Sequence, residues 1–498
     1  MTTALEKDVA APVDNGRRGS HAMRWWVLAV LGVAQLMVVL DATVVNIALP
    51  EAQLDLGFSN SDRQWVVTGY ALAFGSLLLL GGRLSDLFGR RTTFIAGLVG
   101  FALASAVGGA AANFEVLVGA RVAQGVFGAL LAPAALSLLT VTFTEPSERA
   151  KAFGIFGAIA GAGGALGLLL GGALTEWASW RWVMYVNLVF AAVALVGAIL
   201  LLAKHTATER PKLDFPGTIT VTAALFSIVY GFSKAESDGW TKPATLGFLI
   251  GGAVLLALFV ALEARVRNPL LPLRVVLDRT RGASYTAVFL TAIGMFAMFL
   301  FLTYYMQQQL GYSPIITGVA FLPMVAGMVA SSTTVPSLLV PKVGPKVTLV
   351  VGFLLATLGM ALLTRIGVDT AYATHILPSL ILMGVGLGTA MSTAFIGATS
   401  GVHHTDAGVA SAMVNTSQQV GGSIGTALLS TLAATSFSNY VSDHVPPTKL
   451  TMAEAAVHSY TTAFGWAAGI FLVGAVLTGL IMPNKVPEPS EGEPVLAH

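Results

Sequence analysis

Long runs of apolar residues, separated by short polar segments, repeat along almost the whole chain. A helix needs about 20 such residues to cross the ~30 Å hydrocarbon core of a bilayer, and most of the runs reach that length. They are continuous rather than alternating, which excludes a transmembrane β-barrel. Cut at charge clusters and Pro/Gly turns, the runs predict fourteen helices, at residues 25–49, 64–82, 92–111, 115–142, 151–174, 180–203, 216–233, 243–263, 282–306, 315–340, 346–364, 373–399, 408–436 and 459–482.

Composition supports an all-α integral membrane protein. Of 498 residues, 55% are hydrophobic and only 10% are charged, whereas soluble domains carry about 25% charged residues. The chain has no cysteine, which excludes disulfides and thiolate metal sites. It also lacks metal-ligand spacings and a phosphate-binding loop, so we expect no metal, no ATP and no cofactor. Basic residues are scattered rather than clustered into a patch, so no nucleic-acid partner is expected.

The distribution of basic residues predicts the orientation of the chain. Most of its 27 Lys and Arg residues fall in the two tails and in alternate loops, on one side of the predicted membrane. Because Lys and Arg favour the cytoplasmic side, both termini are expected to be cytoplasmic in a multi-pass protein of the plasma membrane. The residues after the first 23 form a run too long for a signal-peptide core, which predicts an uncleaved first span.

A weak internal repeat suggests two halves. LFGRRTTFIAGLVG and KVGPKVTLVVGFLL align when Gly89 is placed over Gly344. Parallel repeats of six helices are common in secondary transporters. The predicted organisation is a cytoplasmic tail (1–24), a six-helix bundle (25–203), a linker with two extra transmembrane helices (204–281), a second six-helix bundle (282–482) and a cytoplasmic tail (483–498).

Asp41 is the one charged residue in the first predicted span, within the sequence LDATVVNIALP (40–50). A carboxylate inside the membrane costs roughly 2.5 to 3.5 kcal/mol even on the most permissive insertion scale, so it should face protein or water. Arg121 is the only basic residue inside a predicted span away from its ends. Counted from the helix ends, Asp41 and Arg121 lie at similar depths, ~12 Å and ~9 Å from the outer surface.

Two interpretations of Asp41 and Arg121 follow. Opposite charges at one depth compensate each other, and arginine stays charged at any working pH. In one interpretation the two residues form a permanent structural ion pair. In the other, protonation of Asp41 or arrival of substrate frees Arg121, so that the pair couples proton movement to transport.

The segment GRLSDLFGRR (82–91) lies at a predicted cytoplasmic turn. Asp86 can accept hydrogen bonds from the N-terminal amides of a neighbouring helix, where the helix dipole favours negative charge, or pair with an arginine. We therefore predict a conformational latch, for which the alternative is a loop that only fixes topology. Its residues are Gly82, Asp86, Gly89, Arg90 and Arg91.

Glycines recur every four residues in the fifth predicted helix. Gly163, Gly167 and Gly171 share one face, and Gly157 and Gly161 form a second pair. Such faces allow helices to pack closely in membranes. We expect tight packing and, in addition, a smooth face along which two halves could rock while blocking a leak of protons or ions.

Polar residues in several spans are candidates for a substrate cavity, with interhelical hydrogen bonding as the alternative for each. Asn415 and Gln419 are four apart and so share a helix face. The candidates are Asn46, Gln124, Tyr304, Gln307, Asn415 and Gln419.

Several of these segments together resemble motifs of the fourteen-helix drug:proton antiporter branch of the major facilitator superfamily. They are LDATVVNIALP, GRLSDLFGRR, ARVAQGVFGALLAP (120–133) and the glycine-rich fifth helix followed by WRW (180–182) and Asn187. Leu168 stands where the antiporter signature usually has proline. The resemblance implies a major facilitator fold and a role for Arg121 in proton transfer.

The expected function is proton-coupled export of amphipathic small molecules, either cationic or neutral, by a monomer that works through alternating access. A second reading keeps the fold and makes the chain an exporter of an endogenous metabolite, natural product or lipid, or an importer. A third is a membrane sensor that does not transport. No nucleophile, base and orienting group recur together, which argues against an enzyme.

Overall fold

The computed structural model describes residues 15–58, 60–203, 214–266, 269–403, 406–444 and 448–484. Within these ranges the regular structure is helical throughout. The first half of the chain forms one bundle of α1 (Asn15–Leu56), α2 (Asn60–Phe88), α3 (Arg90–Gly109), α4 (Phe114–Thr142), α5 (Pro146–Trp177) and α6 (Trp182–Leu201). We call it the N half.

The middle of the chain contributes α7 (Phe215–Asp238), α8 (Pro243–Glu263) and the short α9 (Leu273–Leu277). The second bundle, the C half, contains α10 (Arg279–Tyr304), α11 (Pro314–Ala320), α12 (Leu322–Leu338), α13 (Val340–Leu363), α14 (Leu377–Ala398), α15 (Ala407–Asp443) and α16 (Lys449–Ile481), with π-helical turns at Tyr305–Gln309 and Tyr372–Ile376. Each of the fourteen predicted segments is therefore found as helix.

The boundaries differ from the predicted ones in both halves. α1 covers Asn15–Leu56 rather than 25–49, and α16 begins at Lys449 rather than at 459, because apolar runs mark only the apolar part of a helix, whereas polar helical turns extend beyond it. The segment predicted at 315–340 is also divided at Phe321 into α11 and α12, a break inside an apolar run that hydropathy does not mark. Among the described residues, thirteen helices are long and apolar enough to cross a membrane, and the glycine-rich α5 is not among them.

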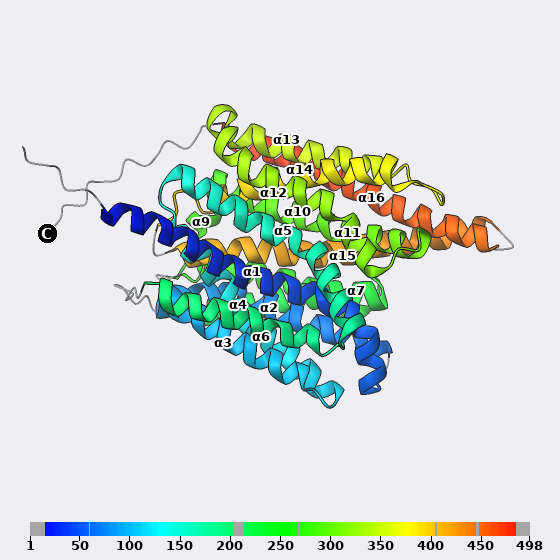
Figure 1. The fold of residues 1–498 in the computed structure, drawn as a ribbon, viewed down its shortest axis with the longest axis horizontal. Helices are drawn as coiled ribbons and strands as arrows, with labels where there is room; N and C mark the ends of the chain where they lie inside the picture. The colour runs from blue at the N-terminus through cyan, green and yellow to red at the C-terminus, as the bar shows by residue number, and fades with distance from the viewer. Residues whose placement is uncertain are drawn as a thin grey trace, which may run out of the picture.

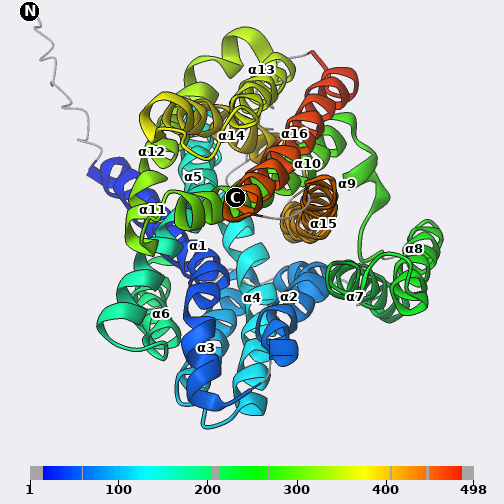
Figure 2. The ribbon, with the colours of Figure 1, turned by 90° about the vertical axis from the view of Figure 1, so that its right-hand side faces the viewer.

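The helices run roughly along the long axis of the molecule, and α1 begins at the same end at which α16 finishes (Figure 1). We call this end the terminal face and the opposite end the distal face. Seen from the distal face, α7 and α8 lie to one side of the two bundles (Figure 2).

The two aligned glycines of the internal repeat adopt the same backbone conformation. Gly89 and Gly344 have positive φ angles of 90° and 82°, and each lies at the turn that precedes an apolar helix.

The glycine stripe of α5 packs inside the N half. Methyl groups added at Gly163, Gly167 and Gly171 would meet Val39, Thr43 and the Val44/Ile47 pair of α1. The expectation that this stripe is the rocking face between the halves therefore needs correction, because a four-residue repeat defines a face but not its partner. What Gly161 packs against lies outside the described part of the structure.

A different face of α5 meets the C half. A methyl group on Gly154 would overlap the carbonyl oxygen of Ser332 in α12, and one on Gly157 would touch Phe395 in α14. On the other side of the molecule, a methyl group on Gly82 of α2 would lie 2.6 Å from the carbonyl oxygen of Gly408 in α15. These close backbone approaches join the two halves near the terminal face.

Replacing Gly154 by alanine should destabilise the interface between α5 and the C half. Overpacking of a filled interface costs typically about 1–3 kcal/mol, so the Gly154→Ala protein should unfold at a lower temperature than the wild type in detergent. Gly119→Ala in α4 is the control, because a methyl group there would meet nothing within 4 Å. Equal melting temperatures for the two variants would contradict the assignment of Gly154 to a tight interface.

Candidate functional site

Asp41 is only 1% exposed and accepts hydrogen bonds from three side chains of the N half. Its Oδ2 accepts from Arg121 NH1 at 2.5 Å, and its Oδ1 accepts from Gln124 Nε2 at 2.9 Å and from Asn187 Nδ2 at 2.7 Å. The two residues predicted to share one depth are thus in direct contact. Helices α1, α4 and α6 supply this group.

Arg121 is also 1% exposed and is held on several sides. NH1 donates to Gln124 Oε1 at 2.8 Å, and Nε donates to the backbone carbonyl of Val66 at 3.1 Å. The guanidinium carbon lies 4.3 Å from the centre of the Tyr70 ring, a cation–π distance. Gln124 Nε2 in turn donates to Ser105 Oγ at 2.7 Å.

This arrangement suits an ionised Asp41. A carboxylate is an acceptor only, and both of its oxygens here receive donors. A buried charge is costly unless it is paired and hydrogen-bonded, and Arg121 supplies the opposite charge. Adding a proton to Asp41 would remove an acceptor and leave the Arg121 charge uncompensated, so protonation and the present packing oppose each other.

The sequence did not single out all members of this network. Gln124, expected in a substrate cavity, lies instead between Asp41 and Arg121 and is fully buried. Asn187 was noted only as part of a motif, and Tyr70 and Ser105 were missed. The available signal for Asn187 was a lone amide in the very apolar α6, which a bilayer tolerates only when it is hydrogen-bonded.

Asp86 lies where the latch hypothesis needs it. Its Oδ1 accepts from the backbone N–H of Gly408 at 3.2 Å, in the first turn of α15, and Arg90 NH2 lies 3.9 Å away. The N half thus holds a carboxylate against the positive end of a C-half helix. Gly89, between α2 and α3, has a positive φ. Arg91, predicted to belong to the latch, donates from NH2 to the Ile199 carbonyl of α6.

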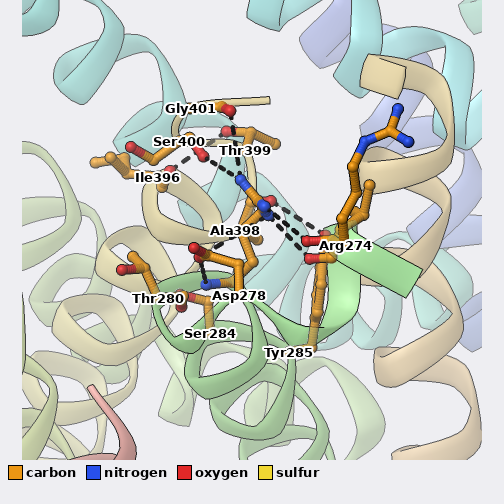
Figure 3. Close-up of polar contacts among 12 residues, drawn as sticks. Arg274, Asp278, Thr280, Ser284, Tyr285, Ile396, Ala398, Thr399, Ser400 and Gly401 are labelled. Atoms are coloured by element: carbon orange, nitrogen blue, oxygen red, sulfur yellow. Dashed lines mark hydrogen bonds and ion pairs between the residues drawn. The ribbon is translucent and has the colours of Figure 1, made fainter. Parts of the chain in front are cut away.

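A second polar contact crosses between the halves at the terminal face. Arg149 NH2, at the start of α5, donates to Thr399 O at 2.7 Å and to Thr399 Oγ1 at 3.1 Å. The turn that begins at Thr399 is anchored from its own half by Arg281 NH1, which donates to the carbonyls of Ser400 and Gly401. Figure 3 shows this turn lying beside Arg274 and Asp278 of the α9 region.

The other predicted cavity residues are dispersed. Asn415 Nδ2 donates to the Ser411 carbonyl of its own helix, and the Gln419 side chain lies against Gly75 of α2, across the halves. Tyr304 is 42% exposed, and Gln307 is half-buried. The side chain of Asn46 lies outside the described residues, as does that of Leu168. Over the described part of the chain, no three His, Cys, Asp or Glu residues gather as a metal site would require.

Comparison with known proteins gives one family. The model of the Major Facilitator Superfamily matches residues 31–426. The chain is 49% identical to "Puromycin resistance protein pur8" of Streptomyces alboniger over 487 residues, covering 97% of this chain and 96% of that protein.

It is also 36% identical to "Cephamycin export protein CmcT" of Amycolatopsis lactamdurans, with 94% of each chain covered. Among solved structures, the human organic anion transporter MFSD10 matches with a TM-score of 0.64 and 16% identity, over 91% of this chain and 99% of that one. At this low identity the last match supports the fold alone.

Removing Arg121 should strongly destabilise the protein. Breaking a buried ion pair from one side costs about 3–5 kcal/mol because the other charge is left uncompensated. The Arg121→Met protein should therefore unfold at a lower temperature than wild type.

The double variant Asp41→Asn/Arg121→Met is the control for this experiment. It removes both charges, so it should be more stable than Arg121→Met alone. A single variant as stable as wild type would contradict a buried, charged pair.

Proposed function

Because the chain belongs to the Major Facilitator Superfamily, and is thus a membrane transporter and not an enzyme, we propose that it exports amphipathic antibiotic-like molecules in exchange for protons. The Asp41–Arg121 network carries the coupling part of this proposal. The names of the relatives support the export part, since they are described as resistance or export proteins for puromycin, cephamycin, tetracenomycin C and lincomycin.

Proton movement and transport are coupled because a proton and Arg121 compete for the carboxylate of Asp41. With Asp41 ionised, Arg121, Gln124 and Asn187 hold α1, α4 and α6 together. A proton on Asp41 cancels its charge, and Arg121 then has to find another acceptor or leave the site. Substrate and proton therefore need not meet directly; it is enough that each favours a different packing of the N half.

A movement of α1 reaches the C half through α5. Val39 and Thr43 flank Asp41 on α1 and rest on Gly163 and Gly167 of α5. The opposite side of α5 meets Ser332 and Phe395 of the C half. A displacement of α1 at Asp41 therefore acts on the helix that packs against both bundles, which is how the alternating opening of the two faces is driven.

The terminal face is assigned to the cytoplasm in this proposal. Basic side chains gather there, and Lys and Arg favour the cytoplasmic side of a membrane. The closed contacts of Asp86 with Gly408 and of Arg149 with Thr399 then seal the cytoplasmic side. Basic residues at this face include Arg24, Arg90, Arg149, Arg265, Arg274, Arg279, Arg281 and Lys342.

The chain is proposed to act as a monomer in the plasma membrane, because the charge network and both latch contacts are formed within one chain. Asp41 is occupied by Arg121, which supports a neutral or weakly charged substrate over one that needs a free carboxylate. The alternative, export of an endogenous metabolite, natural product or lipid, keeps the same coupling machinery and differs only in cargo.

Transport in proteoliposomes tests the proposal. With an imposed pH gradient, the wild type should drive puromycin, or a dye from a small panel, against its concentration gradient and move protons in the opposite direction. Asp41→Asn should lose the gradient-driven component, by about tenfold or more if the pair contributes a typical coupling energy of 1–3 kcal/mol. Arg121→Ala should lose it as well.

Asp55→Asn is the matched control, because Asp55 also pairs with an arginine, Arg181, but lies partly exposed at the distal face. It should keep proton-driven transport. Wild-type coupling in both Asp41→Asn and Arg121→Ala would refute the coupling role. If the protein conducts protons but no compound of the panel stimulates this flux, the alternative cargo is favoured. Metabolite profiling of a deletion strain would then identify that cargo.

A further inference from the structure

The first of the two extra helices contacts both halves of the molecule. α7 packs against α2 of the N half and against α15 of the C half, while α8 packs on α7 (Figure 2). Thr68 Oγ1 and Ser233 Oγ lie 3.4 Å apart on the α2 side, and Trp240 Nε1 donates to Thr431 Oγ1 at 2.8 Å on the α15 side. A change at these helices therefore reaches both bundles.

Two carboxyl groups meet where α7 begins and α8 ends. Asp214 caps α7 through Oδ1, which accepts from Gly217 N at 3.0 Å, and Glu263 Oε2 accepts from Leu271 N at 2.9 Å. The exposed fractions are 6% for Asp214 and 4% for Glu263. The remaining oxygens, Asp214 Oδ2 and Glu263 Oε1, have no hydrogen-bond partner among the described residues.

These two free oxygens point into the same space. A methyl group on Gly217 would overlap both of them, which places them within about 5 Å of each other, a distance at which each carboxylate disfavours the negative charge of the other. A single proton between them would give one oxygen a donor and remove the repulsion. The pair therefore has the composition of a proton-binding site.

Among the described residues, the surrounding positive charges do not neutralise the two carboxylates. Arg83 of α2 is 5% exposed, and its Nε has no partner among the described residues. Its single positive charge acts on Glu263 and also on Asp86. Beyond Arg83, the charges around Asp86 are Arg90 and Asp406, the latter paired with Arg274. Arg83 is therefore shared between Asp86, which Arg90 also faces, and a pair of carboxylates that one arginine does not neutralise.

We propose that Asp214 and Glu263 form a second proton-binding site, in which they share one proton, and that Arg83 transmits its occupancy to the Asp86 latch. The two extra helices then sense the proton concentration at the terminal face. Loss of the shared proton leaves two negative charges that draw Arg83 away from Asp86 and repel each other. The site is separate from Asp41, and it does not depend on the proposed cargo or on the direction of transport.

Infrared difference spectroscopy on the full-length protein tests the site. The Asp41→Asn background removes one other buried carboxyl from the spectrum, while Asp86 and Asp406 remain in every protein compared. Between low and high pH, this parent should show a protonated-carboxyl C=O band that loses intensity on deprotonation and shifts in D₂O. Part of this band should be absent from Glu263→Gln and from Asp214→Asn, where asparagine still caps the helix.

Asp278→Asn is the matched control, because Asp278 also caps a helix at this face, α10, through a hydrogen bond from Arg281 N at 3.0 Å. It should keep the band. A parent without the band, or a band of unchanged intensity in both Glu263→Gln and Asp214→Asn, would overturn the proposal. Melting temperatures within a few degrees of the parent would show that the variants are folded.

Cysteine pairs test the link to the latch, since the natural chain has no cysteine. Spin labels at Phe88→Cys, 67% exposed in the wild type, and at the exposed His403→Cys report the separation of α2 from the start of α15. The distance should change over the pH range in which the band titrates, and it should not change in Glu263→Gln. A distance that changes equally in both proteins would overturn the role of Arg83.

Discussion

The buried ion pair between Asp41 and Arg121 is the interaction on which the rest of this structure depends. Two full charges sit in a bundle whose surface is apolar, and they are tolerated because each finds the other together with amide, carbonyl and aromatic partners. A pair of this kind adds little net stability compared with well-packed apolar residues. In the proposed function, its value lies in having two alternatives, charged and packed or protonated and rearranged, which a hydrophobic core does not offer.

The geometry around this pair explains how a local change can become a global one. Asp41 belongs to a helix segment that rests on the glycine stripe of α5, and the other side of α5 touches the C half through Gly154 and Gly157. Close packing through glycines makes such an interface stiff, so helices shift as units rather than deform. At the terminal face, two separate polar contacts, Asp86 with Gly408 and Arg149 with Thr399, hold the halves together on opposite sides.

Sequence predicted the helices and the charge pair because both follow from strong constraints. Uninterrupted apolar runs have few alternatives to membrane helices, and a lone acid and a lone base at one depth have few partners but each other. The acceptor role of Asp86 was predictable for a different reason, because a carboxylate at a turn favours the N-terminal amides of a neighbouring helix. Sequence did not predict that Gln124 and Asn187 complete the network, or that the α5 stripe faces α1, because helical periodicity defines which residues share a face but not which helix covers it. The packing of α7 against both α2 and α15 likewise depends on tertiary structure.

The most direct test of the central claim is proton release on substrate binding by purified protein in weakly buffered detergent, followed with a pH-sensitive dye. If substrate and proton compete through Asp41, adding a transported compound to the wild type below neutral pH should release protons in proportion to the bound substrate. The Asp41→Asn protein should bind the compound without releasing them. Equal proton release from both proteins would contradict competition at Asp41. So would substrate binding by the wild type without any proton release at any pH.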